Sequence, residues 1–379
     1  MSGPFKGVRV LELTSTVSGP FAGMMLADQG AEVIKIEPPG IGDLARFMGT
    51  IKDGMGAMFS TLNRNKKCIC LDFKNEEDLS ILMELVSTAD VLIENYRPGI
   101  VKKLGIDYET LKKIKPDLIY CSISGYGQTG PYKEKKVYDP LIQGTVGIPH
   151  AQNTEHPELL RTIIYDKVTG LTCAQAISAA LYQKANGEGG QYLPISMMES
   201  ALYYNWPDLM MNYTFEEGGI NLGELADLFE VYETKDGGVV LIIIANDEIF
   251  NKFCEVFELK LHLDEKYNNL VSRIFNRREL TEEINKVTRN FSSNELENIM
   301  DIEGISASVC NELKDVHTDP QVIEQGSIIT IDHPQLGKMK MPKPPASMKG
   351  QNIFPNSCLL YTSDAADEGL GVDLGGRRI

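Results

Sequence analysis

Residues 7–36, GVRVLELTSTVSGPFAGMMLADQGAEVIKI, decide the fold because they contain a strand, a helix and a second strand in succession. The apolar pattern of 7–13 predicts the first strand, and that of 32–36 predicts the second. Between them, Ser18 and Pro20 predict the start of a helix, since serine caps helices and proline favours the first turn. Such a unit is typical of doubly wound α/β proteins. It contains no Gly-x-Gly-x-x-Gly sequence, so a dinucleotide is not indicated.

The same alternation continues through the first 215 residues. Strands are predicted at 68–73, 91–94, 118–122 and 191–196, and helices at 76–87, 108–114 and 139–146, after Asp166, and through residue 211. Strands that alternate with helices favour a mostly parallel sheet covered on both faces. We therefore expect residues 1–215 to form a large Rossmann-like α/β domain.

The composition changes near residue 216. Residues 216–225 form a glycine-rich linker or lid, and residues 226–325 are predicted to form a smaller α/β domain. Its strongest signal is a hairpin, in which strands 229–234 and 239–245 flank a Lys-Asp-Gly-Gly turn. Prolines punctuate an extended segment, 326–357, that is expected to return to the large domain. Residues 358–379 resemble translated vector sequence, and we expect them to be non-native and disordered.

Composition narrows the class of function. The chain has 379 residues and a net charge of −16, so bulk attraction to nucleic acid or to an anionic membrane is not expected. Neither a secretion signal nor a run of about 20 apolar residues is present. The seven cysteines and five histidines are scattered, which indicates reduced thiols in a cytoplasmic protein and no metal site. An anionic ligand must therefore meet a local basic cluster.

A lone carboxylate stands at the start of a predicted helix. In residues 161–170, RTIIYDKVTG, an apolar run ends at Asp166, and apolar residues at helical spacing begin at Val168. This places Asp166 at or near a helix N-cap, where free N–H groups and the helix dipole favour an ionised carboxylate. An ordinary N-cap is the competing interpretation.

An ordered set of motifs resembles the class III CoA-transferases (CaiB/BaiF type), the family of the formyl-CoA and carnitine CoA-transferases. The matching segments occur in family order over about residues 5–350. They are Val-Leu-Glu-Leu at 10–13, Ser-Gly-Pro at 18–20, residues 26–40, Asn-Lys-Lys at 65–67, Leu-Asp at 71–72, residues 94–99, residues 125–131, Asp-x-x-Thr-Gly at 166–170 and Gly-x-Gly-Gly-Gln at 187–191.

The resemblance implies an activity and a nucleophile. The family's catalytic aspartate falls on Asp166, which would attack an acyl-CoA thioester and pass through an aspartyl anhydride and an aspartyl-CoA thioester. The substrates would be an acyl-CoA and a small carboxylic acid. Coenzyme A would act as a cosubstrate, with no permanently bound cofactor and no metal. The family also forms interlocked homodimers, so a homodimer is expected.

The resemblance also implies the binding residues. CoA contacts fall on Val17, Ser18, Leu71, Lys74, Asn95, Tyr96, Arg97, Lys103, Lys136, Val137, Tyr138 and Asp139. Their four cations would supply the positive charge that the phosphates of CoA require. Supporting roles fall on Asp139, Tyr138 and Ser18, and on Gly218 and Gly219 of a mobile loop over the site. Solvated surface charges, helix caps and a plain linker are the competing interpretations.

Some departures from relatives within this family bear on the substrate and on the reaction. Val17 replaces a glutamine of the formyl-CoA enzyme, so the acid need not be formate or oxalate. Tyr138 replaces the histidine base of the 2-methylacyl-CoA racemases, which argues against racemisation. Two alternatives to a transferase remain: a 2-methylacyl-CoA racemase and a non-catalytic CoA-binding protein.

Overall fold

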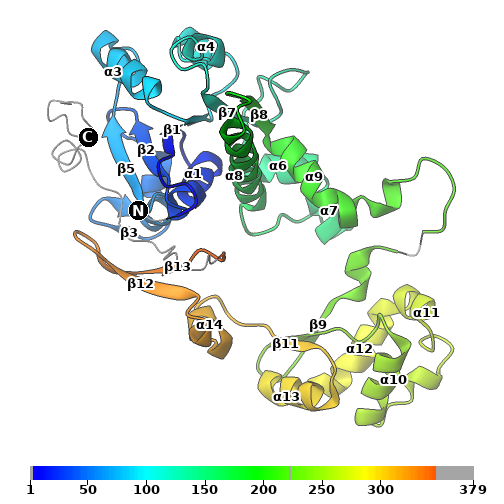
Figure 1. The fold of residues 1–379 in the computed structure, drawn as a ribbon. Coiled ribbons are helices and arrows are strands. Elements are labelled where there is room, and N and C mark those ends of the chain that lie inside the picture. Colours follow the sequence, from blue (N-terminus) through cyan, green and yellow to red (C-terminus); the bar gives the residue numbers. More distant parts are fainter. Residues whose placement is uncertain (1–2, 222, 347–379) are drawn as a thin grey trace. The chain divides into compact units, whose positions relative to one another are not determined.

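The computed structural model describes residues 3–221 and 223–346 and divides into two compact units (Figure 1). The first unit comprises the chain up to Tyr204 and the chain from Ile323 onward, and the second comprises Asn205–Val322. The predicted tail at 358–379 lies outside the described residues. The lid role of 216–225 and the interlocked homodimer stay predictions.

A six-stranded parallel sheet organises the first unit. Its strands are β1 (Arg9–Leu13), β2 (Glu32–Glu37), β5 (Lys66–Cys70), β6 (Val91–Glu94), β7 (Ile119–Ser124) and β8 (Tyr192–Ser196). They lie in the order β5-β2-β1-β6-β7-β8, and every neighbouring pair is parallel. The predicted α/β class with a parallel sheet is therefore confirmed. The order in which strands are added reverses between β1 and β6: β2 and β5 lie on one side of this point, and β6, β7 and β8 on the other. Ligands of such folds bind beyond the carboxyl ends of the strands at this reversal point.

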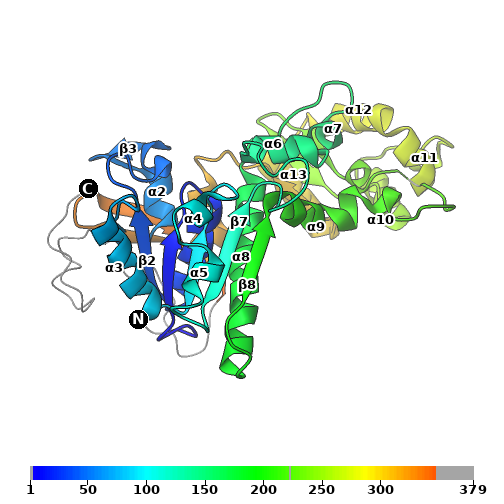
Figure 2. The ribbon, with the colours of Figure 1, turned by 90° about the horizontal axis from the view of Figure 1, so that it is seen from above.

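Helices cover both faces of the sheet (Figure 2). One face carries α1 (Ser18–Asp28) and α8 (Ile164–Ala185), which pack against each other and bury strand residues such as Val10 and Ile93. The other carries α3 (Glu76–Ser87) and α5 (Tyr108–Leu111), which bury Leu11 and Leu92. Successive strand residues thus enter two separate cores, as both-face coverage requires.

Several short elements complete the first unit. They are η1 (Leu44–Phe47), β3 (Ile51–Lys52), β4 (Met55–Gly56), α2 (Ala57–Leu62), α4 (Ile100–Lys103), α6 (Asp139–Thr145), α7 (Ile148–Gln152), β12 (Ile328–His333) and β13 (Gly337–Pro342). Two helices, α9 (Met197–Leu209) and α14 (Pro320–Glu324), span the boundaries between the units. The segment predicted as an extended return contains the antiparallel β12–β13 hairpin. Leu336, at its turn, is buried with Ala45 and Phe59, which ties the hairpin to the residues between β2 and β5.

The second unit contains a three-stranded antiparallel sheet and helices around one core. Its elements are η2 (Met211–Tyr213), η3 (Leu225–Leu228), β9 (Glu230–Glu233), β10 (Gly238–Leu241), α10 (Asp247–Val256), η4 (Leu261–Leu263), α11 (Leu270–Phe275), α12 (Arg277–Thr288), α13 (Ser293–Glu303), β11 (Ala307–Val309) and η5 (Val316–Thr318). The predicted hairpin is present as β9 and β10.

Some predicted boundaries were wrong. Strand β10 ends at Leu241 instead of residue 245, and beyond it the Ile244 carbonyl accepts from the buried guanidinium of Arg273. The helix predicted at 108–114 ends at Leu111, shortly before Pro116, whose ring disfavours helical backbone in the preceding residue. Among the described residues, no helix is both long and apolar enough to cross a membrane. The cytoplasmic location stays a prediction.

Charged side chains are buried inside the first unit, beside the central strand. Glu12 of β1 lies between two lysines, 3.1 Å from Lys35 Nζ and 2.7 Å from Lys66 Nζ, and all three side chains are fully buried. Helix α1 crosses this cluster with Gly23, where an added Cβ would lie 1.9 Å from a Glu12 carboxylate oxygen. The backbone of α1 therefore packs directly on the buried ion pairs.

We predict that Gly23→Ala destabilises the protein by about 1–3 kcal/mol, because the new methyl group must push Glu12 away from its lysines. The measurement is the urea unfolding midpoint. Gly144→Ala is the matched control: its Cβ would meet no atom within 4 Å, so a helical alanine should be neutral or slightly stabilising. Equal midpoints for the two variants would contradict the prediction.

Candidate functional site

Two residues that are far apart in the sequence meet beyond the carboxyl end of β1. The Ser18 hydroxyl donates a hydrogen bond of 2.5 Å to Asp166 Oδ1, and the Ser18 backbone N–H also hydrogen-bonds this carboxylate. Ser18 is the first residue of α1, and Asp166 lies in the first turn of α8. From the sequence, Ser18 was expected to cap α1. The Ser18 side chain makes no cap hydrogen bond and donates to Asp166 instead.

The contact depends on how closely α8 approaches α1 (Figure 1). A Cβ on Gly170 would lie 2.7 Å from the Ser18 carbonyl oxygen and 2.9 Å from the Phe21 ring. Because a backbone carbonyl cannot rotate aside as a side chain can, only glycine fits there. The Asp-x-x-Thr-Gly sequence thus places Asp166 one turn before the point where the two helices touch.

A second carboxylate caps α8. The helix begins at Ile164, so Asp166 lies in the first turn, near the N-cap as expected but not at it. Asp139 Oδ2 accepts from the N–H groups of Tyr165 (2.6 Å) and Asp166 (3.1 Å), and Gln143 donates to the other Asp139 oxygen. Asp139 is buried, and it therefore fixes the backbone that carries Asp166 without occupying the Asp166 carboxylate.

The expectation that helix N–H groups lower the pKa of Asp166 was wrong. Burial raises the pKa of Asp166, and the nearby Asp139 carboxylate raises it further, while the hydrogen bonds from Ser18 lower it. The net direction is upward. The helix N–H groups that were expected to stabilise the charge are already bonded to Asp139.

The remaining predicted residues have different surroundings. Val17 and Leu71 are buried, and the Leu71 side chain belongs to the core under α3. The Asn95 amide is engaged with the backbone of Ser15, accepting at 3.1 Å and donating at 2.9 Å. Tyr138 is 65% exposed just before α6.

Four predicted cations are free to meet a ligand. Their side chains are exposed, and none makes an ion pair within residues 3–221 and 223–346. They are Lys74, Arg97, Lys103 and Lys136. Val137, next to the last of them, is half-buried. Gly218 and Gly219 belong to the second unit and adopt left-handed backbone with φ of 78° and 91°.

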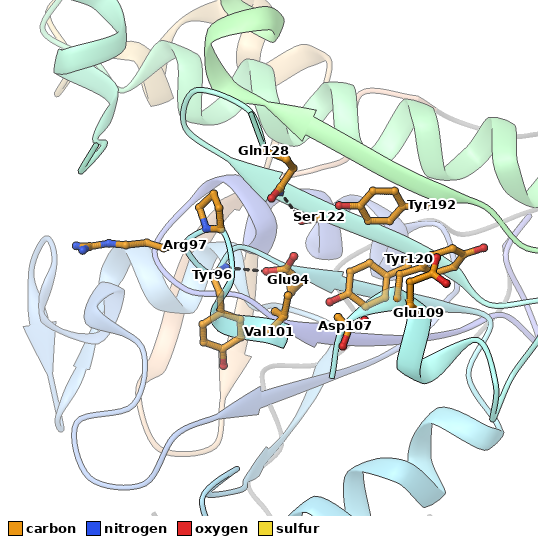
Figure 3. A pocket seen from close by; sticks show the side chains of 12 residues that line it. Glu94, Tyr96, Arg97, Val101, Asp107, Glu109, Tyr120, Ser122, Gln128 and Tyr192 are labelled. Carbon is orange, nitrogen blue, oxygen red and sulfur yellow. Dashed lines mark hydrogen bonds between the residues drawn. The ribbon is translucent and has the colours of Figure 1, made fainter. Parts of the chain in front are cut away.

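A pocket of about 240 Å³ opens on the face of the sheet opposite α8 (Figure 3). Tyr96 and Arg97 line it together with Glu94, whose carboxylate accepts from the Tyr96 N–H at 2.8 Å. Burial raises the pKa of Glu94 to about 7. Asp166 is not among the described residues that line this pocket.

Sequence reasoning gave Glu94 no role of its own. The available signal was a carboxylate that ends the wholly apolar run Val91–Ile93. Within the described residues, no group of three or more histidine, cysteine or acidic side chains is arranged to hold a metal ion.

Comparison with known proteins identifies the family. The model of CoA-transferase family III matches residues 5–356. The human succinyl-CoA:glutarate CoA-transferase is 33% identical over 350 residues, covering 90% of this chain and 79% of the relative. The acetyl-CoA:oxalate CoA-transferase of Acetobacter aceti is 37% identical over 260 residues, 67% of each chain.

A solved structure agrees in fold. The CaiB/BaiF family protein from Brucella suis superimposes with a TM-score of 0.81 at 31% identity, covering 93% of this chain and 94% of that one. The family resemblance expected from the motifs is therefore confirmed, and the chain belongs to CoA-transferase family III.

Proposed function

We propose that this protein transfers CoA from an acyl-CoA thioester to a carboxylic acid, with Asp166 as the covalent nucleophile. The observation that carries the proposal is the contact between Asp166 and the two donors of Ser18 at the reversal point of the sheet. Family membership supplies the reaction class. In this proposal CoA is a cosubstrate, and the enzyme holds no permanent cofactor.

The proposed reaction consists of four exchanges. A carboxylate oxygen of Asp166 attacks the thioester carbonyl, which forms an acyl-aspartyl anhydride and releases CoA thiolate. The thiolate attacks the aspartyl carbonyl, which forms an aspartyl-CoA thioester and releases the first acid. The acceptor carboxylate then attacks this thioester and regenerates an anhydride and CoA thiolate. Attack by the thiolate on the acceptor's carbonyl carbon yields the new acyl-CoA and free Asp166.

The surrounding residues have separate roles in this scheme. Ser18 holds the attacking carboxylate in one orientation. Its donors would stabilise negative charge on the Asp166 carboxylate. Asp139 positions the helix turn that carries Asp166. The exposed cations Lys74, Arg97, Lys103 and Lys136 would meet the phosphates of CoA.

The acid substrate is proposed at the level of a class. The human and Acetobacter relatives are named for glutarate and oxalate, and a Chloroflexus aurantiacus relative, 32% identical over 363 residues, is named for D-citramalate. All three acids carry two carboxyl groups. We therefore propose a small dicarboxylic acid as the acceptor, to be sought by pairwise exchange between acyl-CoAs and such acids.

We predict that Asp166→Ala and Asp166→Asn lower the exchange rate on the order of 10³-fold or more, as loss of a covalent nucleophile does. Both variants should still bind CoA, measured by calorimetry. Hydroxylamine trapping of the wild type during turnover, followed by peptide mapping, should label Asp166. An unlabelled Asp166 together with full activity of the amide variant would refute the mechanism.

The raised pKa of Asp166 predicts the pH profile. The nucleophile must be ionised, so kcat/KM should fall on acidification through this pKa, at a pH above the usual aspartate range. Ser18→Ala removes a donor that favours the charged form and should move this acid limb to higher pH. Ser178→Ala, whose hydroxyl bonds only the Ala174 carbonyl on α8, is the control and should leave the limb in place.

The racemase alternative makes a distinct prediction. Tyr138 occupies the position of the racemase base and is exposed, and a phenol is a poor base near neutral pH. Incubation with a 2-methylacyl-CoA in D₂O without an acceptor acid should therefore leave the α-carbon unlabelled by mass spectrometry. Deuterium uptake without acid exchange would favour the racemase. CoA binding with no exchange for any acid would favour a binding protein.

A further inference from the structure

The loop that joins β1 to α1 is strained at one residue. Thr16 has φ of +72°, in the left-handed region that β-branched residues rarely adopt. It lies two residues before Ser18, so its conformation sets the direction in which α1 begins. Left-handed backbone at such a residue persists only where the surroundings impose it.

A buried aspartate imposes it. Asp43 Oδ1 accepts from the Thr16 N–H at 2.8 Å and from the Ala45 N–H at 2.9 Å. Its other oxygen lies 2.9 Å from Lys35 Nζ, and Asp43 is only 1% exposed. Because each oxygen has a fixed partner, the carboxylate cannot rotate away from Thr16.

The rest of the loop is held in the same way. Lys35 Nζ donates to the Thr14 carbonyl at 2.8 Å. Ser15 is bonded through both its N–H and its carbonyl to the Asn95 amide, which follows β6. The side chains of Lys35, Asp43 and Asn95, which come from three other segments, thus hold the backbone from Thr14 to Thr16.

We propose that Asp43 is a positioning residue for the transfer reaction: by holding Thr16 in its left-handed conformation, it aims the Ser18 donors at Asp166. This inference rests on the proposed role of Asp166 as nucleophile. Asp43 acts on Asp166 indirectly, through the backbone of the loop that carries Ser18.

The principal test is Asp43→Ala. We expect kcat to fall about 100-fold, the size of effect that follows a misplaced reacting group, with KM for the acyl-CoA changed less than about threefold. Asp43→Asn keeps an acceptor for Thr16 and should lose less than about tenfold. Asp28→Ala is the matched control, since Asp28 is also buried and paired with Arg64 but lies at the far end of α1. The Asp28→Ala variant should have a lower free energy of unfolding than wild type, but its kcat should not fall in the same way.

Two further measurements separate positioning from general destabilisation. Hydrogen exchange of peptides covering residues 14–18, measured without substrate, should quicken in Asp43→Ala and not in Asp28→Ala. The acid limb of kcat/KM should move to higher pH in Asp43→Ala alone, because Asp166 would lose the donors that favour its charged form.

Asp43→Ala values that match those of Asp28→Ala in kcat, exchange and pH profile would overturn the inference. If Asp43→Ala does not fold, Asp43→Leu, which leaves no cavity and also removes the acceptor for Thr16, takes its place in the same three measurements, and values equal to wild type in all of them would overturn the inference. Failure of the proposed function is distinguishable, since wild type would then show no label at Asp166 while the exchange of residues 14–18 still reports on Asp43.

Discussion

The contact between α8 and the first turn of α1 decides what Asp166 can do. Gly170 allows the two backbones to touch at the Ser18 carbonyl, and Asp166 lies one turn earlier, level with the Ser18 hydroxyl and N–H. A larger residue at 170 would separate the helices and leave the carboxylate facing no donor. The site therefore comes from helix packing on the sheet, and the ends of both helices are fixed by groups outside them, Asp139 for α8 and Asp43 for the loop before α1.

The buried ions beside β1 are best understood through this geometry. Buried ion pairs cost desolvation that their attraction barely offsets, so they are weak evidence for stability. Here the lysines also donate to backbone carbonyls, Lys35 to Thr14 and Lys66 to Pro20, on either side of Ser18. An apolar replacement would remove the lysine hydrogen bonds to both carbonyls. The cluster thus specifies one conformation of the β1–α1 connection, a role that a hydrophobic core of equal volume cannot fill.

The sequence was a good guide to the elements and a poor guide to what joins them. Apolar spacing reports which residues face the sheet, so it predicted the strands, the parallel arrangement and a helix beginning near Asp166. It could not show that Asp139, from another helix, takes the free N–H groups of α8, because no local pattern encodes that bond. Asp43 gave no signal at all, and Lys35 gave only the weak one of a charge inside an apolar strand. The proposed role of Asp166 therefore comes from the family motifs, while the direction of its pKa shift was predicted wrongly.

That error has a chemical consequence. An aspartate stabilised by several helix N–H groups would be firmly ionised but a weak nucleophile, because the same bonds that hold its charge would resist its transfer to an acyl group. Burial acts in the opposite direction, because it raises the pKa of Asp166. An acyl-aspartyl anhydride hydrolyses readily, so the proposed chemistry requires that water be kept from the half-buried carboxylate while the intermediate exists. Ser18 limits the cost, since the hydrogen bonds from its hydroxyl and its N–H lower the pKa of Asp166 and so favour the charged form that attacks.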